Sequence, residues 1–400
     1  MARDSTDADV CHHQRMRVLF TATSGWGHIH PMAPLARAFL DIGDEVLWAT
    51  GAEPASRLER HGFRAAPAGL AQQEGMAIFN RRFPELHDLP RPEWPDFMFP
   101  RLFGGVLAGP MLADLLPLAG EWSPDLVVND AAELAGPIVA AGLNVPNLSH
   151  AFGALLPAAR VTAAGVEVGH LWSDNGLAPR AHGGLYDHLY LDIYPPSMQS
   201  ADRPHVSATQ LLSPGSFATS GDEELPDWVT EPSGTPLVYI TFGTVFTNDD
   251  VLATVLEAVR ELPTRVVVTV GPQGDPAGLG SQPDNVHVAR YIPQDRLLAH
   301  CAAVVSHAGS GTFLAALAAG LPQLCLPQAA DQFLNAAACT RSGVGLSLGP
   351  GDVSVDKVRE SVDRLLSDPA FRVAAQRGSD EIAAMPSARE VAERLHADNA

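Results

Sequence analysis

The chain has 400 residues, 46% of them hydrophobic, which is enough apolar material to fill more than one core. Its formal net charge is −20. No basic stripe is present to neutralise phosphates, and this argues against nucleic acid as a partner. The four cysteines show no metal-ligand spacing and fit reduced thiols in a cytosolic protein: Cys11, Cys301, Cys325 and Cys339.

Neither the start of the chain nor its apolar runs indicate a membrane protein. Residues 1–15 are polar, so we expect no signal peptide and no fixed structure there. The uncharged run 308–330 is long enough to span a bilayer, but its glycines, Pro322 and Pro327 divide it into helix and strand. We therefore expect no membrane insertion and a cytoplasmic location.

The chain opens as half of a Rossmann-like domain. Residues 16–23 are predicted to form a buried strand, residues 32–40 a helix and residues 45–50 a second strand. The loop between the first two contains Gly25 and Gly27.

The glycine pattern of this loop is an incomplete dinucleotide fingerprint. His30 stands where a third glycine would sit, although Glu53 lies near the position of a ribose-binding acid. A nicotinamide or flavin oxidoreductase is therefore one alternative.

A histidine and a carboxylate follow two strands of this domain. His28 lies on the loop after the first strand, where an imidazole can take a proton from a bound hydroxyl. Asp130 ends the predicted strand 125–129, and a carboxylate there can orient and charge-stabilise the imidazole. Glu133 is a nearby alternative partner, and helix capping is the structural alternative for both His28 and Asp130.

From Ala65 to Leu118 the sequence is irregular, with several prolines and many aromatic residues, including Phe83 and Phe103. We interpret it as loops and short helices that build an apolar acceptor pocket, although ordinary core packing explains any single ring equally well. The expected acceptor contacts, two of them outside this stretch, are Trp26, Phe79, Trp94, Phe97, Phe99 and Phe152.

Residues 210–235 are rich in Pro, Ser and Gly and are interpreted as a linker. A second α/β domain begins with the strand 237–241 and a small turn that contains Gly243 and Thr244. Further strands are predicted over 265–270 and 286–290.

The second domain contains a strand, a Gly-rich turn and a helix start, an arrangement suited to phosphate. The strand 303–306 leads into His307, Gly309, Ser310, Gly311 and Thr312. Free backbone N–H groups and the helix dipole there favour an anion, and His307 can add a positive charge. A tight turn without a ligand is the structural alternative.

Groups that can recognise a sugar and a base flank this turn. Asp331 and Gln332 precede a helix, where they can bind sugar hydroxyls, although Asp331 is also a good N-cap residue. Tyr291 offers an aromatic face for a base and Gln294 an amide for a ribose. Together these features indicate a nucleotide-sugar site.

The motifs Tyr-Ile-Pro-Gln (291–294), His-Ala-Gly-Ser-Gly-Thr (307–312) and Asp-Gln-x-x-Asn (331–335) resemble the donor signature of GT-B glycosyltransferases. The resemblance is to the bacterial antibiotic (macrolide) and plant secondary-product type. Gly27-His28-x-x-Pro31 resembles the loop of the family's catalytic base. Plant members have a Trp-Asn pair where this chain has Ser310-Gly311.

The resemblance implies a role for each site residue. Tyr291 would stack on the base, the Ile292 backbone would contact it and Gln294 would bind the ribose. The diphosphate would be held by Thr244, His307, Gly309, Ser310, Gly311 and Thr312. Asp331 and Gln332 would bind the sugar, and His28 with Asp130 would form the catalytic dyad.

The resemblance also implies an α/β fold of the GT-B class, with two facing Rossmann-like domains, parallel sheets and an interdomain cleft. The expected divisions are an acceptor domain (16–209), a linker (210–235), a donor domain (236–384) and a C-terminal helix (385–400) that crosses back to the first domain.

The expected activity is inverting transfer from a dTDP- or UDP-sugar, with a deoxysugar favoured, to a hydroxyl of an apolar natural product such as a polyketide. No metal and no cofactor beyond the sugar nucleotide is expected, and a homodimer is compatible with the sequence. A GT-B-fold epimerase or hydrolase, or a binding protein with an inactive site, is the remaining alternative.

Overall fold

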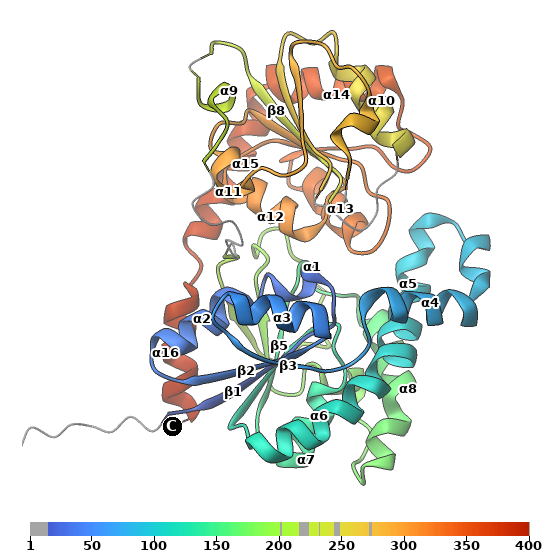
Figure 1. The fold of residues 1–400 in the computed structure, drawn as a ribbon, viewed down its shortest axis with the longest axis vertical. Helices are drawn as coiled ribbons and strands as arrows, with labels where there is room; N and C mark the ends of the chain where they lie inside the picture. Colours follow the sequence, from blue (N-terminus) through green and yellow to red (C-terminus); the bar gives the residue numbers. More distant parts are fainter. Residues whose placement is uncertain are drawn as a thin grey trace, which may run out of the picture.

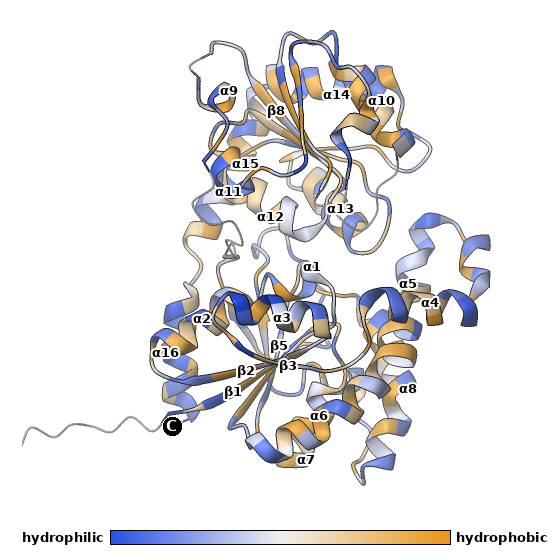
Figure 2. Ribbon diagram, viewed as in Figure 1, coloured by the Kyte–Doolittle hydropathy of each residue, from blue (hydrophilic) through white to orange (hydrophobic). Residues whose placement is uncertain are grey.

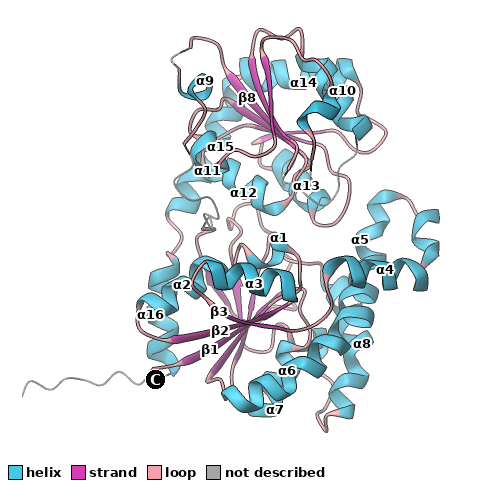
Figure 3. Cartoon of the chain, viewed as in Figure 1, coloured by secondary structure: helices cyan, strands magenta, loops and turns pink. Residues whose placement is uncertain are grey.

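A computed structural model describes residues 15–200, 202–215, 224–231, 233–243, 249–271 and 274–399. These residues build two parallel sheets, each covered by helices on both faces (Figures 1 and 3). The strands are the most hydrophobic part of both domains in Figure 2, as expected for sheets buried on both faces. The predicted α/β fold with two Rossmann-like domains is confirmed.

The first sheet has seven strands in the order β3-β2-β1-β4-β5-β6-β7. The strand order therefore reverses between β1 and β4, and in such sheets the crevice for a ligand lies at the carboxyl ends of those two strands. The strands are β1 Arg17–Thr21, β2 Glu45–Thr50, β3 Arg64–Pro67, β4 Leu126–Asp130, β5 Asn147–His150, β6 Leu189–Asp192 and β7 Thr209–Leu211.

The helices of the first domain are α1 Trp26–Ile29, α2 Ala33–Asp41, α3 Ala52–Arg60, α4 Gln72–Arg82, α5 Trp94–Phe99, α6 Ala108–Trp122, α7 Gly136–Leu143 and α8 Ala158–Asp174. Short 3-10 turns occupy Pro84–Asp88, Arg91–Glu93 and Ala181–Gly184. A π-helical segment, η3, covers Pro100–Leu107 and joins α5 to α6.

The stretch 65–118 is more regular than its prolines suggested. Helices α5, η3 and α6 follow one another directly, and α6 alone has 15 residues. Pro100 lies inside this continuous run, at the point where α5 passes into η3, and its missing N–H coincides with the change from α-helical to π-helical hydrogen bonding. The expectation of mainly loops and short helices here is therefore wrong.

Within the described residues, the run Arg91–Trp122 is the one helix that is long and apolar enough to cross a membrane by length and composition. Some of its buried residues, such as Phe99 and Met111, belong to the main core of the first domain, and others, such as Trp94, belong to the helical layer beside it. This arrangement is typical of the core helix of a globular domain. The run 308–330 is divided between helix and strand, as predicted.

The second sheet has six strands in the order β10-β9-β8-β11-β12-β13, and its order reverses between β8 and β11. The strands are β8 Leu237–Thr241, β9 Arg265–Thr269, β10 Val286–Ala289, β11 Ala303–Ser306, β12 Gln323–Cys325 and β13 Gly345–Ser347. The helices are α9 Asp227–Thr230, α10 Asp249–Val259, α11 Gln294–Leu298, α12 Ser310–Ala318, α13 Gln332–Arg341, α14 Val355–Ser367 and α15 Pro369–Ala383, with a 3-10 turn at Pro276–Leu279.

The segment interpreted as a linker is shorter than predicted. Strand β7 pairs with β6 up to Leu211, two residues inside the expected linker. At the other end, Val229 of α9 is buried in the core of the second domain. Residues 216–223, between them, lie outside the described residues.

The last helix, α16 (Ala388–Asn399), returns to the first domain and packs against α2, as Figure 1 shows. The His396 Nδ1 atom lies 2.9 Å from Oδ1 of the buried Asp44. The same Oδ1 accepts a hydrogen bond from the Met16 amide. The C-terminal helix therefore lies against the first domain.

The two domains contact each other through apolar and polar groups. The Tyr194 ring stacks on Phe313 with centroids 6.0 Å apart. The Tyr194 hydroxyl also donates a 3.0 Å hydrogen bond to Oδ1 of Asn335. Gly153 approaches Ser310 so closely that a Cβ atom on Gly153 would lie 1.9 Å from the Ser310 Oγ atom. The carboxyl edges of the two sheets therefore face each other.

We expect Gly153→Ala to destabilise the contact between the domains. The added methyl group would also lie 2.7 Å from the Ser310 Cβ atom, so the domains must separate or the backbone must shift. Overpacking of this kind costs about 1–3 kcal/mol. A lower melting temperature and a larger radius of gyration in small-angle X-ray scattering are the expected results.

Gly142→Ala is the matched control, because a Cβ atom on Gly142 would meet nothing within 4 Å. In that variant the melting temperature should be native or higher, and the radius of gyration should be native. A Gly153→Ala protein that behaves like this control would contradict the close interdomain contact.

Candidate active site

His28 and Asp130 meet where the strand order of the first sheet reverses. The loop after β1 forms the single turn α1, which the His28 amide closes by donating to the Gly25 carbonyl at 3.0 Å. The His28 Nδ1 atom lies 2.9 Å from Oδ2 of Asp130. The Asp130 side chain is fully buried, and the His28 side chain is 20% exposed. The Nε2 atom is therefore the ring nitrogen left to face a ligand.

Three influences set the pKa of His28. Burial lowers it, but the charge and hydrogen bond of Asp130 raise it, and the charge of Asp331 raises it further. The net result is a pKa above the usual 6.5. Asp331 belongs to the second domain, so the basicity of this histidine depends on both domains. The imidazole is suited to accept a proton near neutral pH.

His30 has the opposite environment. Its ring packs on Trp26, with centroids 5.0 Å apart, and the Arg57 guanidinium lies 4.3 Å from the Trp26 ring centroid. Burial and the positive charges of Arg57 and His61 lower the pKa of His30 to about 4. His30 is therefore neutral at physiological pH and too weak a base for catalysis. These contacts give the half-buried Trp26 a packing role, and its contact with an acceptor stays a prediction.

Two aromatic rings flank the His28 imidazole. Phe152, which the sequence predicted, lies 4.8 Å away between centroids, and Phe103 lies 5.5 Å away. Phe103 was recognised only as one aromatic residue of an irregular stretch. It belongs to the π-helical segment η3, and the sequence pattern does not predict which face of that segment a residue occupies.

The other predicted acceptor residues are core residues of a separate helical layer. Phe79 is fully buried, Trp94 is nearly so, and Phe97 packs edge-on against Phe79 with centroids 6.5 Å apart. Phe99 is buried in the main core, where it contacts Phe103. The expectation that Phe79, Trp94, Phe97 and Phe99 line an open pocket is wrong in this structure, because the helices of this stretch pack these rings against one another.

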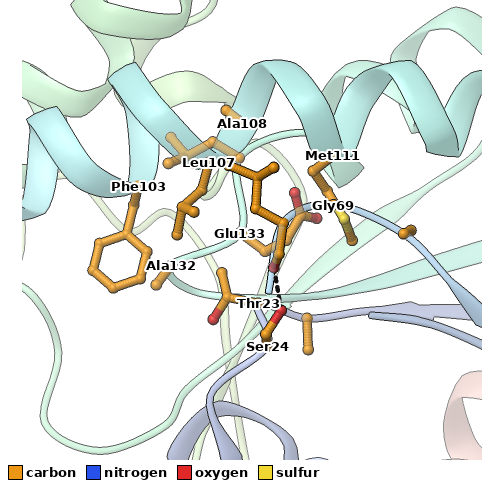
Figure 4. A pocket seen from close by; sticks show the side chains of 13 residues that line it. Thr23, Ser24, Gly69, Phe103, Leu107, Ala108, Met111, Ala132 and Glu133 are labelled. Carbon is orange, nitrogen blue, oxygen red and sulfur yellow. Dashed lines mark hydrogen bonds between the residues drawn. The ribbon is translucent and has the colours of Figure 1, made fainter. Parts of the chain in front are cut away.

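A small recess lies beside Phe103 (Figure 4). Its volume is about 20 Å³, room for about one water molecule. Its walls are mainly apolar, with polar atoms from Thr23, Ser24 and Glu133; the lining residues are Ala22, Thr23, Ser24, Ala68, Gly69, Leu70, Phe103, Leu107, Ala108, Met111, Ala132, Glu133 and Leu134. A large apolar ligand at this place requires side chains of η3 and α6 to move.

His307 directly follows β11, where the strand order of the second sheet reverses. Its ring lies between two glycines: a Cβ atom on Gly243 would be 2.8 Å from the ring, and one on Gly309 would be 2.4 Å from it. Loss of hydration lowers the pKa of His307, although Asp331 and the Thr241 backbone oppose this effect. Without a bound anion the His307 ring is therefore disfavoured from carrying a positive charge.

Helix α12 begins directly at the Gly-rich turn. Gly309 is its N-cap in extended conformation, and Ser310 is its first residue. Gly311 is exposed, and Thr312 is half-buried in the first turn. The unpaired N–H groups of this turn make a favourable environment for an anion. Thr244, the other expected diphosphate contact, lies outside the described residues.

Hydrogen bonds to Asp331 connect the motif 331–335 to the Gly-rich motif 307–312. The Asp331 Oδ2 atom accepts hydrogen bonds from the Ser310 amide at 3.2 Å and from the Ser310 hydroxyl at 2.5 Å. It also accepts from Nδ2 of Asn335 at 3.2 Å, and the same amide donates to the Ala308 carbonyl at 2.9 Å. Although Asp331 is the N-cap residue of α13, no side-chain cap bond is present, so the capping alternative is not supported.

Gln332 is partly committed to the loop that carries it. Its Oε1 atom accepts hydrogen bonds from the amides of Gln328 at 2.7 Å and Ala329 at 3.0 Å. Asn335 was quoted as part of the motif without a role, and the structure shows it bonding to Ser310, Asp331 and, across the interface, Tyr194.

The base and ribose residues lie at the start of α11. Tyr291 is 45% exposed, while Ile292 is buried behind it. Gln294 is the first residue of α11. The Tyr291 ring therefore presents an accessible aromatic face, and the burial of Ile292 anchors this segment to the core.

Known proteins resemble this chain over almost its whole length. Residues 101–243 and 253–397 match the N-terminal and C-terminal domains of the family described as erythromycin biosynthesis protein CIII-like. The elloramycin glycosyltransferase ElmGT of Streptomyces olivaceus is 33% identical, over 95% of this chain and 97% of that protein.

Two solved structures resemble it in fold. The glycosyltransferase SnogD from Streptomyces nogalater has a TM-score of 0.76 at 28% identity and covers 97% of this chain and 100% of its own. The spinosyn rhamnosyltransferase SpnG complexed with thymidine diphosphate has a TM-score of 0.77 at 26% identity, with 95% and 100% coverage. The chain belongs to the erythromycin biosynthesis protein CIII-like family, and it is a glycosyltransferase of the GT-B fold.

Proposed function

We propose that this glycosyltransferase moves a deoxysugar from a dTDP-sugar to a hydroxyl of an apolar natural product such as a polyketide, with inversion at the anomeric carbon. His28 is the general base and Asp130 its orienting partner. The observation that supports this most directly is the 2.9 Å contact between His28 and the buried Asp130, opposite the donor motifs.

The reaction begins with the acceptor hydroxyl at the Nε2 atom of His28. The hydroxyl proton passes to Nε2, and the Asp130 carboxylate beside Nδ1 stabilises the resulting imidazolium. The acceptor oxygen forms a bond to the anomeric carbon as the bond to the diphosphate breaks on the opposite face. The proton leaves His28 to solvent after the product departs.

Negative charge then develops on the leaving diphosphate. The N-terminal amides of α12, the Thr312 side chain and the His307 ring can stabilise this charge by hydrogen bonding. Tyr291 stacks on the base, the Ile292 backbone contacts it, and Gln294 binds the ribose. We keep metal independence as a prediction, together with a cytoplasmic location and a homodimer.

Two observations favour a thymidine nucleotide and a deoxysugar. SpnG, a structural neighbour, is described in complex with thymidine diphosphate. Oδ2 of Asp331 and Oε1 of Gln332 already accept hydrogen bonds within the protein, so few acceptors are left for sugar hydroxyls. A sugar with fewer hydroxyls suits such a site. We infer the acceptor class from ElmGT, whose name describes it as an elloramycin glycosyltransferase.

The oxidoreductase alternative is wrong, because the chain is a glycosyltransferase over nearly its whole length. The structure gives a physical reason for the incomplete fingerprint, since His30 fills the third glycine position and packs on Trp26. The family assignment likewise favours transfer over epimerisation or hydrolysis.

The first test compares His28→Ala with His30→Ala in an assay with dTDP-sugars and a panel of hydroxylated aromatic polyketides. Loss of a general base lowers the rate ~10²–10⁴-fold, so His28→Ala should lose at least this much activity. His30→Ala should lose much less. If both variants keep the native melting temperature and lose the same amount of activity, His28 is not the general base.

The second test follows the pH dependence of kcat/KM in the native enzyme and in Asp130→Asn. The base must be neutral, so native activity should rise with pH through a value above 6.5, because the pKa of His28 is raised. Without the Asp130 charge, burial lowers this pKa, so the acid limb should move to lower pH while the maximum falls ~10²-fold or more. An acid limb that does not move would show that another group sets the profile.

The third test is calorimetric titration with dTDP and UDP. We expect dTDP to bind more tightly than UDP, and Thr312→Ala to weaken dTDP binding about tenfold, the loss of a hydrogen bond to a charged group. Thr162→Ala is the control, because Thr162 is an exposed residue of α8 whose hydroxyl bonds only to its own helix at Ala158. Native affinity in Thr312→Ala would remove this residue from the donor site.

A further inference from the structure

Glu133 is a buried carboxyl group that the mechanism above does not use. It follows β4 by three residues and is only 2% exposed. Its backbone amide donates a 2.8 Å hydrogen bond to the Asp130 carbonyl, so the two acidic residues share one tight turn. Its side chain also lines the recess beside Phe103 (Figure 4).

Three donors converge on the Glu133 side chain. The Thr21 hydroxyl donates to Oε2 at 2.6 Å, the Ala135 amide donates to Oε1 at 2.6 Å, and the Gly136 amide donates to Oε2 at 2.8 Å. Thr21 is the last residue of β1, whose following loop carries His28. Ala135 and Gly136 form the N-terminus of α7. One carboxylate therefore connects the end of β1 to the turn that carries Asp130.

The packing around this carboxylate leaves no room for a larger neighbour. A Cβ atom on Gly136 would lie 2.7 Å from the Thr21 hydroxyl, 2.8 Å from Oε2 of Glu133 and 2.9 Å from the Asn129 Cβ atom. Glycine at this position lets α7 approach the carboxylate closely. The connection is thus built from two strands and a helix terminus.

We propose that Glu133 is a positioning residue of the glycosyl transfer: its ionised carboxylate fixes the His28 loop and the Asp130 turn relative to each other, so that Nδ1 and Oδ2 stay in contact. This inference rests on the proposed role of His28 and Asp130. Glu133 acts through those two residues and does not touch the substrates.

The positioning is strongest in the charged form. A carboxylate accepts from all three neighbours, whereas a protonated carboxyl has an O–H group that must itself donate. The Ala135 and Gly136 amides can only donate, so the O–H must turn to the Thr21 hydroxyl, which then accepts instead of donating, and the protonated oxygen becomes a weaker acceptor for the amides. Protonation therefore weakens the connection. The charged group that faces Glu133 is Asp130; the other groups that face it are the Thr21 hydroxyl and the α7 amides.

Protonation occurs near physiological pH. Burial raises the pKa of Glu133 to about 7, with a further contribution from Asp130, although the three hydrogen bonds oppose the shift. The connection should therefore be strongest above about pH 7 and weaken as the pH falls below it. Protonation of His28 at low pH affects activity in the same direction.

The deciding experiment is an NMR pH titration of the His28 ring, assigned with His28→Ala, on the whole protein with saturating dTDP. In the native protein the ring should report its own titration and a second transition near pH 7. In Glu133→Gln the second transition should disappear and the pKa of His28 should fall, because Asp130 is no longer held against it. A native His28 titration curve in Glu133→Gln would overturn the proposal.

Variants of Thr21 separate geometry from charge. Thr21→Val removes one hydrogen bond without changing any charge and should also lower the pKa of His28. Thr21→Ser keeps the hydroxyl and should behave as native. If Thr21→Val leaves the His28 titration unchanged while its melting temperature is native, the connection through β1 is refuted. The dTDP affinity measured by calorimetry should stay native in Glu133→Gln, Thr21→Val and Thr21→Ser. Native affinity shows that the second domain is folded in each variant.

Activity distinguishes this inference from the proposed function. If His28→Ala retains native turnover, the catalytic dyad is wrong, and the ring titration then still tests the structural connection. If His28→Ala is inactive and Glu133→Gln keeps the native kcat/KM profile, only the positioning role fails. In the expected case, Glu133→Gln lowers kcat/KM about tenfold. In a plot of log(kcat/KM) against pH, the limiting slope on the acid side falls from about two, for the ionisations of His28 and Glu133, towards about one, for His28 alone.

Discussion

In a parallel sheet whose strand order reverses, the loops that follow the two flanking strands run to opposite sides and leave a crevice between them. Both sheets of this protein have one such reversal, between β1 and β4 and between β8 and β11. His28 follows β1 and Asp130 ends β4, whereas Gly243 and His307 follow the second pair of strands. Because contacts such as Tyr194 to Asn335 hold the two edges face to face, the crevices form a single site.

The turn proposed to hold the diphosphate has no lysine in its Gly-rich loop and belongs to a chain of net charge −20. The pKa of His307 is lowered, which disfavours a positive charge on its ring, and Asp331 is a carboxylate in the same motif block. Stabilisation of an anion must therefore come from oriented dipoles, chiefly the first turn of α12. Gly243 and Gly309 contribute by admitting the His307 ring between them.

The sequence was most informative where residue type and sheet topology act together. His28, Asp130 and Asp331 could be placed because each follows a recognisable buried strand, and parallel strands bring such positions to one edge. The aromatic stretch could not be resolved in the same way. Phe103 reaches His28 because the π-helical segment η3 sets its direction, and no local pattern signals that register. Phe79 is buried because α4, which carries it, packs against that segment. The role of Asn335 could not be predicted from the sequence, because its hydrogen-bond partners lie in three different segments of the chain.

The charges of the site connect its two halves. Asp331 orders the donor turn through Ser310, and its charge also raises the pKa of His28 in the other domain. The basicity of His28 therefore depends on a carboxylate of the opposite domain as well as on Asp130 in its own domain, so the motif that orders the donor turn also contributes to the environment of the histidine.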